Sequence, residues 1–142
     1  MPKSSPPRRK HQHKWTPGSA LLPDRRDKLA ADAYQAIADF EAGKGTGESR
    51  QALVYLLQVV GVAAQRKEVP RQIKLAIRAG QHALIEADKR YLVLNTWGLT
   101  LEGMAAVRQA VKAADVVLRR VETGIVGKAI VKVRDLAQAE QP

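Results

Sequence analysis

The sequence predicts an all-α protein: a compact bundle of about five helices with a flexible basic N-terminal arm. Of its 142 residues, 45% are apolar but only 4% are aromatic, so the core must be aliphatic and rich in alanine. Apolar residues recur at intervals of three and four rather than in alternation, which is the pattern of amphipathic helices. A sheet protein would show more aromatic and β-branched residues in alternation. The length suits a single hydrophobic core and therefore one domain.

Residues 1–23 differ in composition from the rest of the chain. They hold five of the seven prolines, and their five charged side chains are all positive, against a net charge of +10 for the whole chain. We therefore expect residues 1–23 to be a disordered basic arm and residues 24–142 to be the helical bundle domain.

A basic arm on a mildly basic body is typical of a protein that binds a polyanion, because each neutralised phosphate releases counterions. The alternative is that the positive charge only keeps a small protein in solution. An indole beside cations suits stacking on an unpaired base, although Trp15 equally suits docking onto the domain. The arm residues predicted to bind nucleic acid are Lys3, Arg8, Arg9, Lys10, Lys14 and Trp15.

The first helix is expected to begin with Asp24 as its N-cap and to run to about Ala42. Residues 43–47 (GKGTG) then end it. They resemble a phosphate-binding loop only superficially, because that loop follows a buried strand, so we interpret them as a helix connector. The predicted inner edge of the helix is Leu29, Ala33, Tyr34, Ile37 and Phe40 or Glu41.

The second helix is predicted from Gln51 to about Arg66, opened by Thr46 or Ser49. Its apolar residues cover most of the circumference, so it is either buried on several sides or faces another chain. Gly61 lowers helix propensity by ~1 kcal/mol relative to Ala, a cost that a helix crossing at this point offsets; Gly80 is the expected partner and Gly103 a second. The predicted stripe is Leu53, Leu56, Leu57, Val60 and Ala64, extended by Val54, Val59 and Val62.

The third helix begins near Arg71 and ends before a corner that contains Trp97. Spacing places Arg71, Lys74 and Arg78 on the side away from its apolar seam, so these three cations are also predicted to bind nucleic acid. Thr100 is the expected N-cap of the following helix. The predicted seam is Ile73, Ile77, Gly80, Leu84, Ala87 and Tyr91.

Two further helices are predicted, from Leu101 to about Val121 and from about Ile125 to Ala139. Between them Thr123 is the expected cap. The fourth helix should bury Met104, Val107, Val111, Ala114, Leu118 and Val121, and the last should bury Val126, Ile130, Val133 and Leu136.

One short segment carries a resemblance to known proteins. Arg90-Tyr91, followed by residues 96–100 (TWGLT) and a helix that begins Leu101-Glu102, resembles small uncharacterised helical proteins carried by phages, prophages and plasmids of proteobacteria. The resemblance implies an accessory protein of a mobile element and brings no catalytic residues with it.

Several classes of function are disfavoured. The chain has no cysteine, so disulfides, thiolate zinc sites and cysteine nucleophiles are excluded. His11 and His13 lack a third ligand, and His82 has the setting of a surface residue, so we expect no metal, no cofactor and no enzyme. With no run of ~18 apolar residues and no hydrophobic signal segment, we expect a cytoplasmic protein that makes no membrane contact.

Two functions remain. The first is a small basic accessory or regulatory protein of a mobile genetic element that binds nucleic acid or a nucleoprotein complex, mainly through backbone electrostatics. The alternative is a helical protein-binding adaptor, inhibitor or self-assembling subunit, a homo-oligomer included, that docks on an acidic protein surface. The apolar second helix favours this alternative, because exposed aliphatic surface usually marks an interface.

Overall fold

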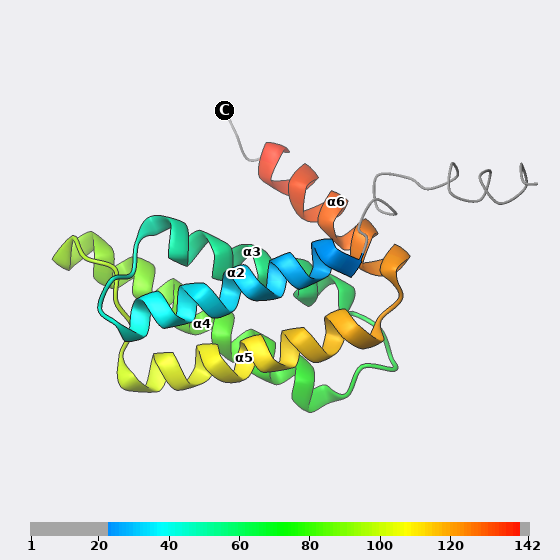
Figure 1. The fold of residues 1–142 in the computed structure, drawn as a ribbon, viewed down its shortest axis with the longest axis horizontal. Coiled ribbons are helices and arrows are strands. Elements are labelled where there is room, and N and C mark those ends of the chain that lie inside the picture. The colour runs from blue at the N-terminus through cyan, green and yellow to red at the C-terminus, as the bar shows by residue number, and fades with distance from the viewer. Residues whose placement is uncertain (1–22, 140–142) are drawn as a thin grey trace, which may run out of the picture.

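The computed structural model of the chain describes residues 23–139, which form five helices and no strand (Figure 1). This confirms the prediction of an all-α bundle. The predictions for Lys3, Arg8, Arg9, Lys10, Lys14 and Trp15 lie outside the described residues. The helices are α2 (Pro23–Glu41), α3 (Gly47–Ala63), α4 (Arg71–Leu94), α5 (Leu101–Arg120) and α6 (Thr123–Ala139).

Helix α3 lies at the centre of the bundle and packs against each of the other four helices. Its predicted stripe is buried, and Val59 is fully buried beside it. Neighbours within the same chain therefore cover most of the apolar circumference of α3, whereas Val54 and Val62 are only partly buried. Helices α4 and α5 run side by side, joined by the short corner at residues 95–100 (Figure 1).

Gly80 marks the closest approach of α4 to α5. A Cβ built on Gly80 would lie 2.2 Å from the Cβ of Ala110, a distance that two side chains cannot share. The expected pairing of Gly61 with Gly80 is wrong, because Gly61 instead faces the side chain of Gln81. Adjacent residues on a helix point about 100° apart, so α4 directs Gly80 at α5 and Gln81 at α3. Gly103 likewise faces Ala83 of α4 and not Gly61.

Side-chain caps fix the starts of two helices. The hydroxyl of Thr46 accepts a hydrogen bond from the amide of Ser49 at 3.1 Å, and the Ser49 hydroxyl accepts one from the amide of Thr46 at 3.2 Å. This reciprocal cap starts α3 at Gly47, four residues before the predicted Gln51. The predicted cap of α5 is confirmed, since the hydroxyl of Thr100 accepts from the amide of Gly103 at 2.9 Å.

Two other predicted caps are wrong. Helix α2 begins at Pro23, so Asp24 lies within its first turn rather than at the cap. Helix α6 begins at Thr123 itself. The main-chain carbonyl of Glu122 accepts hydrogen bonds from the amides of Ile125 and Val126, which places the cap one residue before the predicted one.

The inner edge of α2 also differs from the prediction. Tyr34 is 42% exposed and Ala36 is buried in its place; an alanine lets α2 lie close to its neighbours, whereas the Tyr34 hydroxyl needs a polar partner and donates to Asp115 at 3.4 Å. Glu41 is exposed and forms an ion pair with Arg108. The buried core is aliphatic and rich in alanine, as the composition indicates.

The corner between α4 and α5 is locally ordered. Asn95 ends α4 in the left-handed conformation, with a φ of 59°, which asparagine tolerates better than most residues. The Trp97 ring then stacks on Tyr91 with 4.1 Å between ring centroids, as expected for a side chain on the bend. Within residues 23–139, no helix is both long and apolar enough to cross a bilayer.

Candidate functional site

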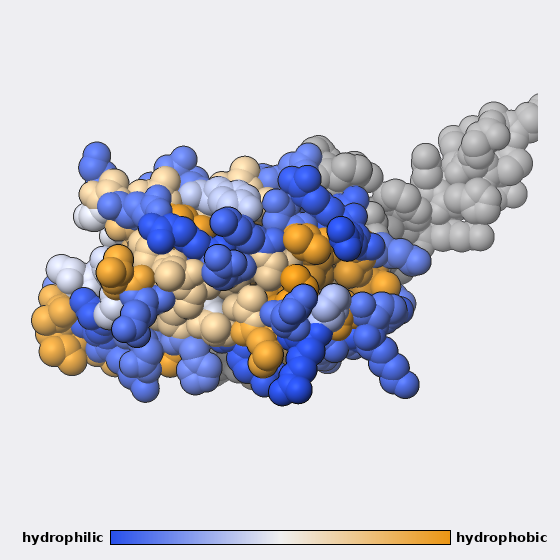
Figure 2. Space-filling model, turned by 90° about the horizontal axis from the view of Figure 1, so that it is seen from below, coloured by the Kyte–Doolittle hydropathy of each residue, from blue (hydrophilic) through white to orange (hydrophobic). Residues whose placement is uncertain are grey.

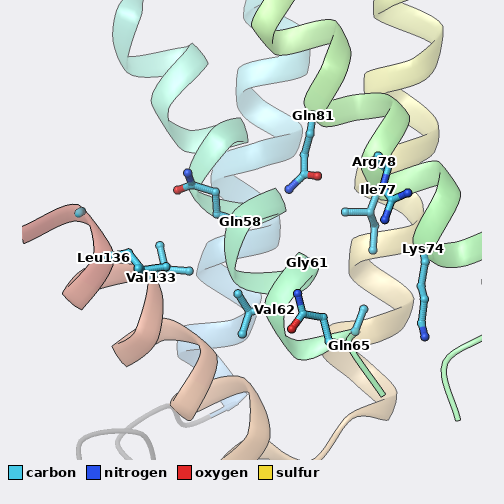
Figure 3. A pocket seen from close by; sticks show the side chains of 12 residues that line it. Gln58, Gly61, Val62, Gln65, Lys74, Ile77, Arg78, Gln81, Val133 and Leu136 are labelled. Atoms are coloured by element: carbon cyan, nitrogen blue, oxygen red, sulfur yellow. The ribbon is translucent and has the colours of Figure 1, made fainter. Parts of the chain in front are cut away.

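A groove runs over the outer face of α3. Helices α4 and α6 both pack on α3 and have little contact with each other, so α3 forms the floor of the groove and the other two helices form its walls (Figure 3). The groove has a volume of about 370 Å³. It is lined by Gln58, Gly61, Val62, Ala64 and Gln65 from α3 and the residues after it, Lys74, Ile77, Arg78 and Gln81 from α4, and Val133, Leu136 and Ala137 from α6.

The floor of the groove carries amides. Gln58 and Gln65 are exposed in it, and Gln81 reaches across from α4 towards α3 (Figure 3). The Nε2 of Gln81 donates to the main-chain carbonyl of Leu57 at 3.2 Å. Gly61 makes this contact feasible, because a Cβ at that position would lie 3.3 Å from the same Nε2. The carbonyl oxygen of the Gln81 amide is not used in that bond.

The α4 wall carries cations. Lys74 and Arg78 lie one turn apart on the same face and both line the groove, with Ile77 between them. Arg71 is exposed one turn before Lys74 but does not line the groove. The structure therefore brings together two of the three α4 residues predicted to bind nucleic acid and places Arg71 beyond the end of the groove.

Among residues 23–139, no carboxylate lines this groove. Arg71, Lys74 and Arg78 form no ion pair with any side chain that the structure describes. The carboxylate of Glu68, in the connector before α4, pairs with Arg66 at 3.3 Å. Its own main-chain amide, then Arg66 and to a lesser extent Lys74, lower the pKa of the Glu68 carboxyl. The cations that do form ion pairs within residues 23–139 are Lys28, Arg50, Arg66, Lys89, Arg108 and Arg119.

The α6 wall is aliphatic. Val133 is almost fully buried, whereas Leu136 is 53% exposed, so the prediction that Leu136 is buried is wrong. Figure 1 shows the reason: the C-terminal half of α6 points away from the bundle. Its apolar side chains there face the groove instead of the core.

A second hollow, of about 500 Å³, lies where the α3–α4 connector meets the end of α5. It is larger than the groove, but its charges are mixed: Arg66 and Arg120 line it together with Glu68 and Glu122. Charges of opposite sign at close range cancel the field that an ionic ligand would feel. The carboxylate-free groove is therefore the better candidate site.

The sequence did not predict the glutamines as site residues. A signal for them was present, because Gln58 and Gln65 are seven residues apart and interrupt the apolar surface of the helix predicted from Gln51 to about Arg66, although α3 itself ends at Ala63. Gln81 had no such signal, since its partner is a main-chain carbonyl on another helix. His82 is exposed on α4, and among the side chains described no three histidines and carboxylates lie close enough together to hold a metal ion.

No family model, no curated protein and no solved structure matches this chain. The chemistry of the groove therefore decides which function we propose. The groove offers two cations, three amides and an aliphatic wall. Such a site is suited to holding an organic anion in place.

Proposed function

We propose that this protein binds nucleic acid, mainly through the sugar-phosphate backbone, as a small accessory or regulatory protein of a mobile genetic element. The observation that carries the proposal is the set of α4 cations: Lys74 and Arg78 line a groove in which no described carboxylate lies, Arg71 is exposed one turn before Lys74, and none of the three forms an ion pair among the described residues. The resemblance of residues 90–102 to proteins of phages and plasmids supports the biological setting.

Cations that form no ion pair, as these do not among the described residues, gain more free energy from binding phosphate than cations that already form one. When a lysine or arginine neutralises a phosphate, the counterions condensed on the nucleic acid are released into solution. Because this release is less favourable when the solution already holds much salt, binding weakens as salt is added. A cation that already holds a carboxylate must first give up that partner. Arg71, Lys74 and Arg78 have no such partner to lose among the described residues, so they contribute more to binding than the paired cations do.

The test is fluorescence anisotropy of a labelled oligonucleotide over a series of salt concentrations. We expect K74A/R78A to bind about tenfold or more weakly and to lower the slope of log K against log salt by about 2, one unit for each phosphate contact. Replacement of Arg8, Arg9 and Lys10 by serine in the full chain should lower the slope further.

The matched control is K28A/K89A, which removes the same charge from two exposed cations that are paired with Asp32 and Glu86. We expect its slope to stay within about half a unit of the wild type. Affinity that is the same at low and high salt, or equal losses in the two double variants, would contradict the proposal.

A second candidate function, self-association, is favoured by a different feature. At the α4–α5 corner Leu92, Val93, Leu94 and Leu101 are between 56% and 87% exposed, and Figure 2 shows apolar side chains gathered at this end of the molecule. A contact between two such tips would cover the same patch on both copies. Sedimentation velocity of the wild type and of L92S/L101S tests it: a wild type that stays monomeric at high concentration rules it out.

A further inference from the structure

We infer that the groove between α3, α4 and α6 holds one unpaired nucleotide, so that the protein prefers a single strand to a duplex. In this arrangement Lys74 and Arg78 contact the phosphate, and the glutamine amides contact the edge of the base. The inference rests on the proposed function, since it specifies which form of nucleic acid the same site accepts.

The size of the groove fits one nucleotide. A volume of about 370 Å³ lies near the lower end of the range for small-molecule pockets, ~300–1,000 Å³. Its lining extends from Gln58 to Gln65 along the floor and from Lys74 to Gln81 along the α4 wall. The stretch from Lys74 to Gln81, which lies within α4, covers about 10 Å at 1.5 Å per residue. The groove is thus as long as one nucleotide and not as long as an extended strand.

The cations, the amides and the aliphatic side chains occupy different parts of the groove, and they match the phosphate, the base edge and the base face of a nucleotide. The cations lie together on one wall, and the aliphatic side chains of Val133 and Leu136 lie on the opposite wall (Figure 3). The amides of Gln58 and Gln65 lie between them. An amide both donates and accepts hydrogen bonds, as does the edge of a base, and an apolar wall accepts the face of the base.

Only an unpaired base satisfies the edge and the face contacts together. In a duplex the Watson–Crick edge of the base is already paired, its groove edges alone remain open to an amide, and both of its faces are stacked on their neighbours. Proteins that read single strands contact bases whose edges and faces are accessible. A duplex can reach the Arg71, Lys74 and Arg78 cations through its phosphates, but it cannot place a base on the floor of the groove.

An acidic amphipathic helix is the competing occupant, because it would pair its carboxylates with Lys74 and Arg78. Two features of the groove disfavour it. The lining spans only about two turns of a docked helix, and the apolar face of such a helix would cover the amides of Gln58 and Gln65 without offering them partners. Burying polar groups without hydrogen bonds is costly.

The experiment compares a labelled single strand with a hairpin duplex of the same base composition, by anisotropy at one salt concentration. We expect the wild type to bind the single strand about tenfold more tightly than the duplex, in keeping with the loss of the hydrogen bonds that the Gln58 and Gln65 amides make to the base. The variant Q58L/Q65L should lose most of this preference while its affinity for the duplex stays within about twofold. Both positions are exposed, so the variant is expected to fold.

The control is Q35L/Q109L, which alters two exposed glutamines on α2 and α5 outside the groove; it should keep the preference. Equal affinity of the wild type for strand and duplex, or an unchanged preference in Q58L/Q65L, would overturn the inference but leave the proposed function standing. Absence of salt-dependent binding to either nucleic acid would overturn both. A synthetic amphipathic helix with glutamates on its polar face that binds more tightly than the strand, and loses this affinity in K74A/R78A but keeps it in Q58L/Q65L, would assign the groove to an acidic helix and overturn the inference.

Discussion

The side-chain amide of Gln81 on α4 donates a 3.2 Å hydrogen bond to the main-chain carbonyl of Leu57 on α3. The bond passes over Gly61, where a side chain would crowd the amide. It therefore fixes one wall of the groove to its floor. It also explains why a glycine is tolerated in the middle of α3 despite its low helix propensity.

The first prediction concerns the coupling of Gly61 with Gln81. In the wild type, G61A gains helix propensity but places its Cβ 3.3 Å from the Gln81 amide, so we expect little net change in the free energy of unfolding. In a Q81A background the crowding is gone, and the same substitution should stabilise the protein by about 1 kcal/mol. Urea unfolding of the four proteins of this cycle measures the difference. Equal effects of G61A in the two backgrounds would show that the residues are not coupled.

The second prediction concerns Gly80 and Ala110. The G80A variant would place two Cβ atoms 2.2 Å apart, so α4 and α5 must separate, and we expect a loss of about 1–3 kcal/mol in the free energy of unfolding. Adding A110G should restore part of that loss, because it removes the atom that clashes. Thermal unfolding followed by circular dichroism checks both. A G80A variant as stable as the wild type would contradict the close approach of these helices.

The third prediction concerns an ion pair between α3 and α4. Arg50 contacts Asp88 with two nitrogens, at 2.9 and 2.7 Å, and both side chains are about one-third exposed or less. Bidentate arginine–carboxylate pairs are stronger than hydrogen bonds between neutral groups. We therefore expect D88A to lower the free energy of unfolding by about 1–2 kcal/mol. The control E86A removes a carboxylate of the same helix whose pair with Lys89 is exposed. Its effect should stay below about 0.5 kcal/mol in urea unfolding.

The fourth prediction concerns alkaline pH. Partial burial, and then Asp115, raise the pKa of Tyr34 above its ordinary value of 10.0. The folded state therefore keeps this proton more tightly than the unfolded state, and the stabilisation it provides is complete below pH 10 and is lost as the pH rises through the folded pKa. We expect the unfolding free energy of the wild type to fall more steeply above pH 10 than that of Y34F. Parallel curves for the two proteins would contradict this.

Helix existence and type were predictable because aliphatic spacing is a local property of the chain. The stripe of α3, the stripe of α5 apart from the partly buried Val121, and the cap at Thr100 are found as predicted. The burial of a side chain was harder to predict where that side chain suits both the core and the surface. Tyr34 has the spacing of a core residue, but its hydroxyl keeps it at the surface beside Asp115.

The groove shows where local patterns stop being informative. Spacing places Lys74 and Arg78 on one face of α4, and the structure confirms that placement. Their relation to Gln58 depends on how α4 and α6 settle on α3, which no interval within one helix encodes. For the same reason the partner of Gly80 proved to be Ala110 rather than Gly61.

The sequence by itself determined that the chain forms aliphatic helices, where α4 and α5 begin, and that cations are concentrated outside the apolar seams. Only the tertiary structure decided which faces meet and that α4 and α6 leave the outer face of α3 uncovered between them. The physical reason is the distance along the chain over which the interactions act. Helix formation follows from hydrogen bonds and contacts four residues apart, whereas the groove depends on close packing between segments that are far apart in the chain.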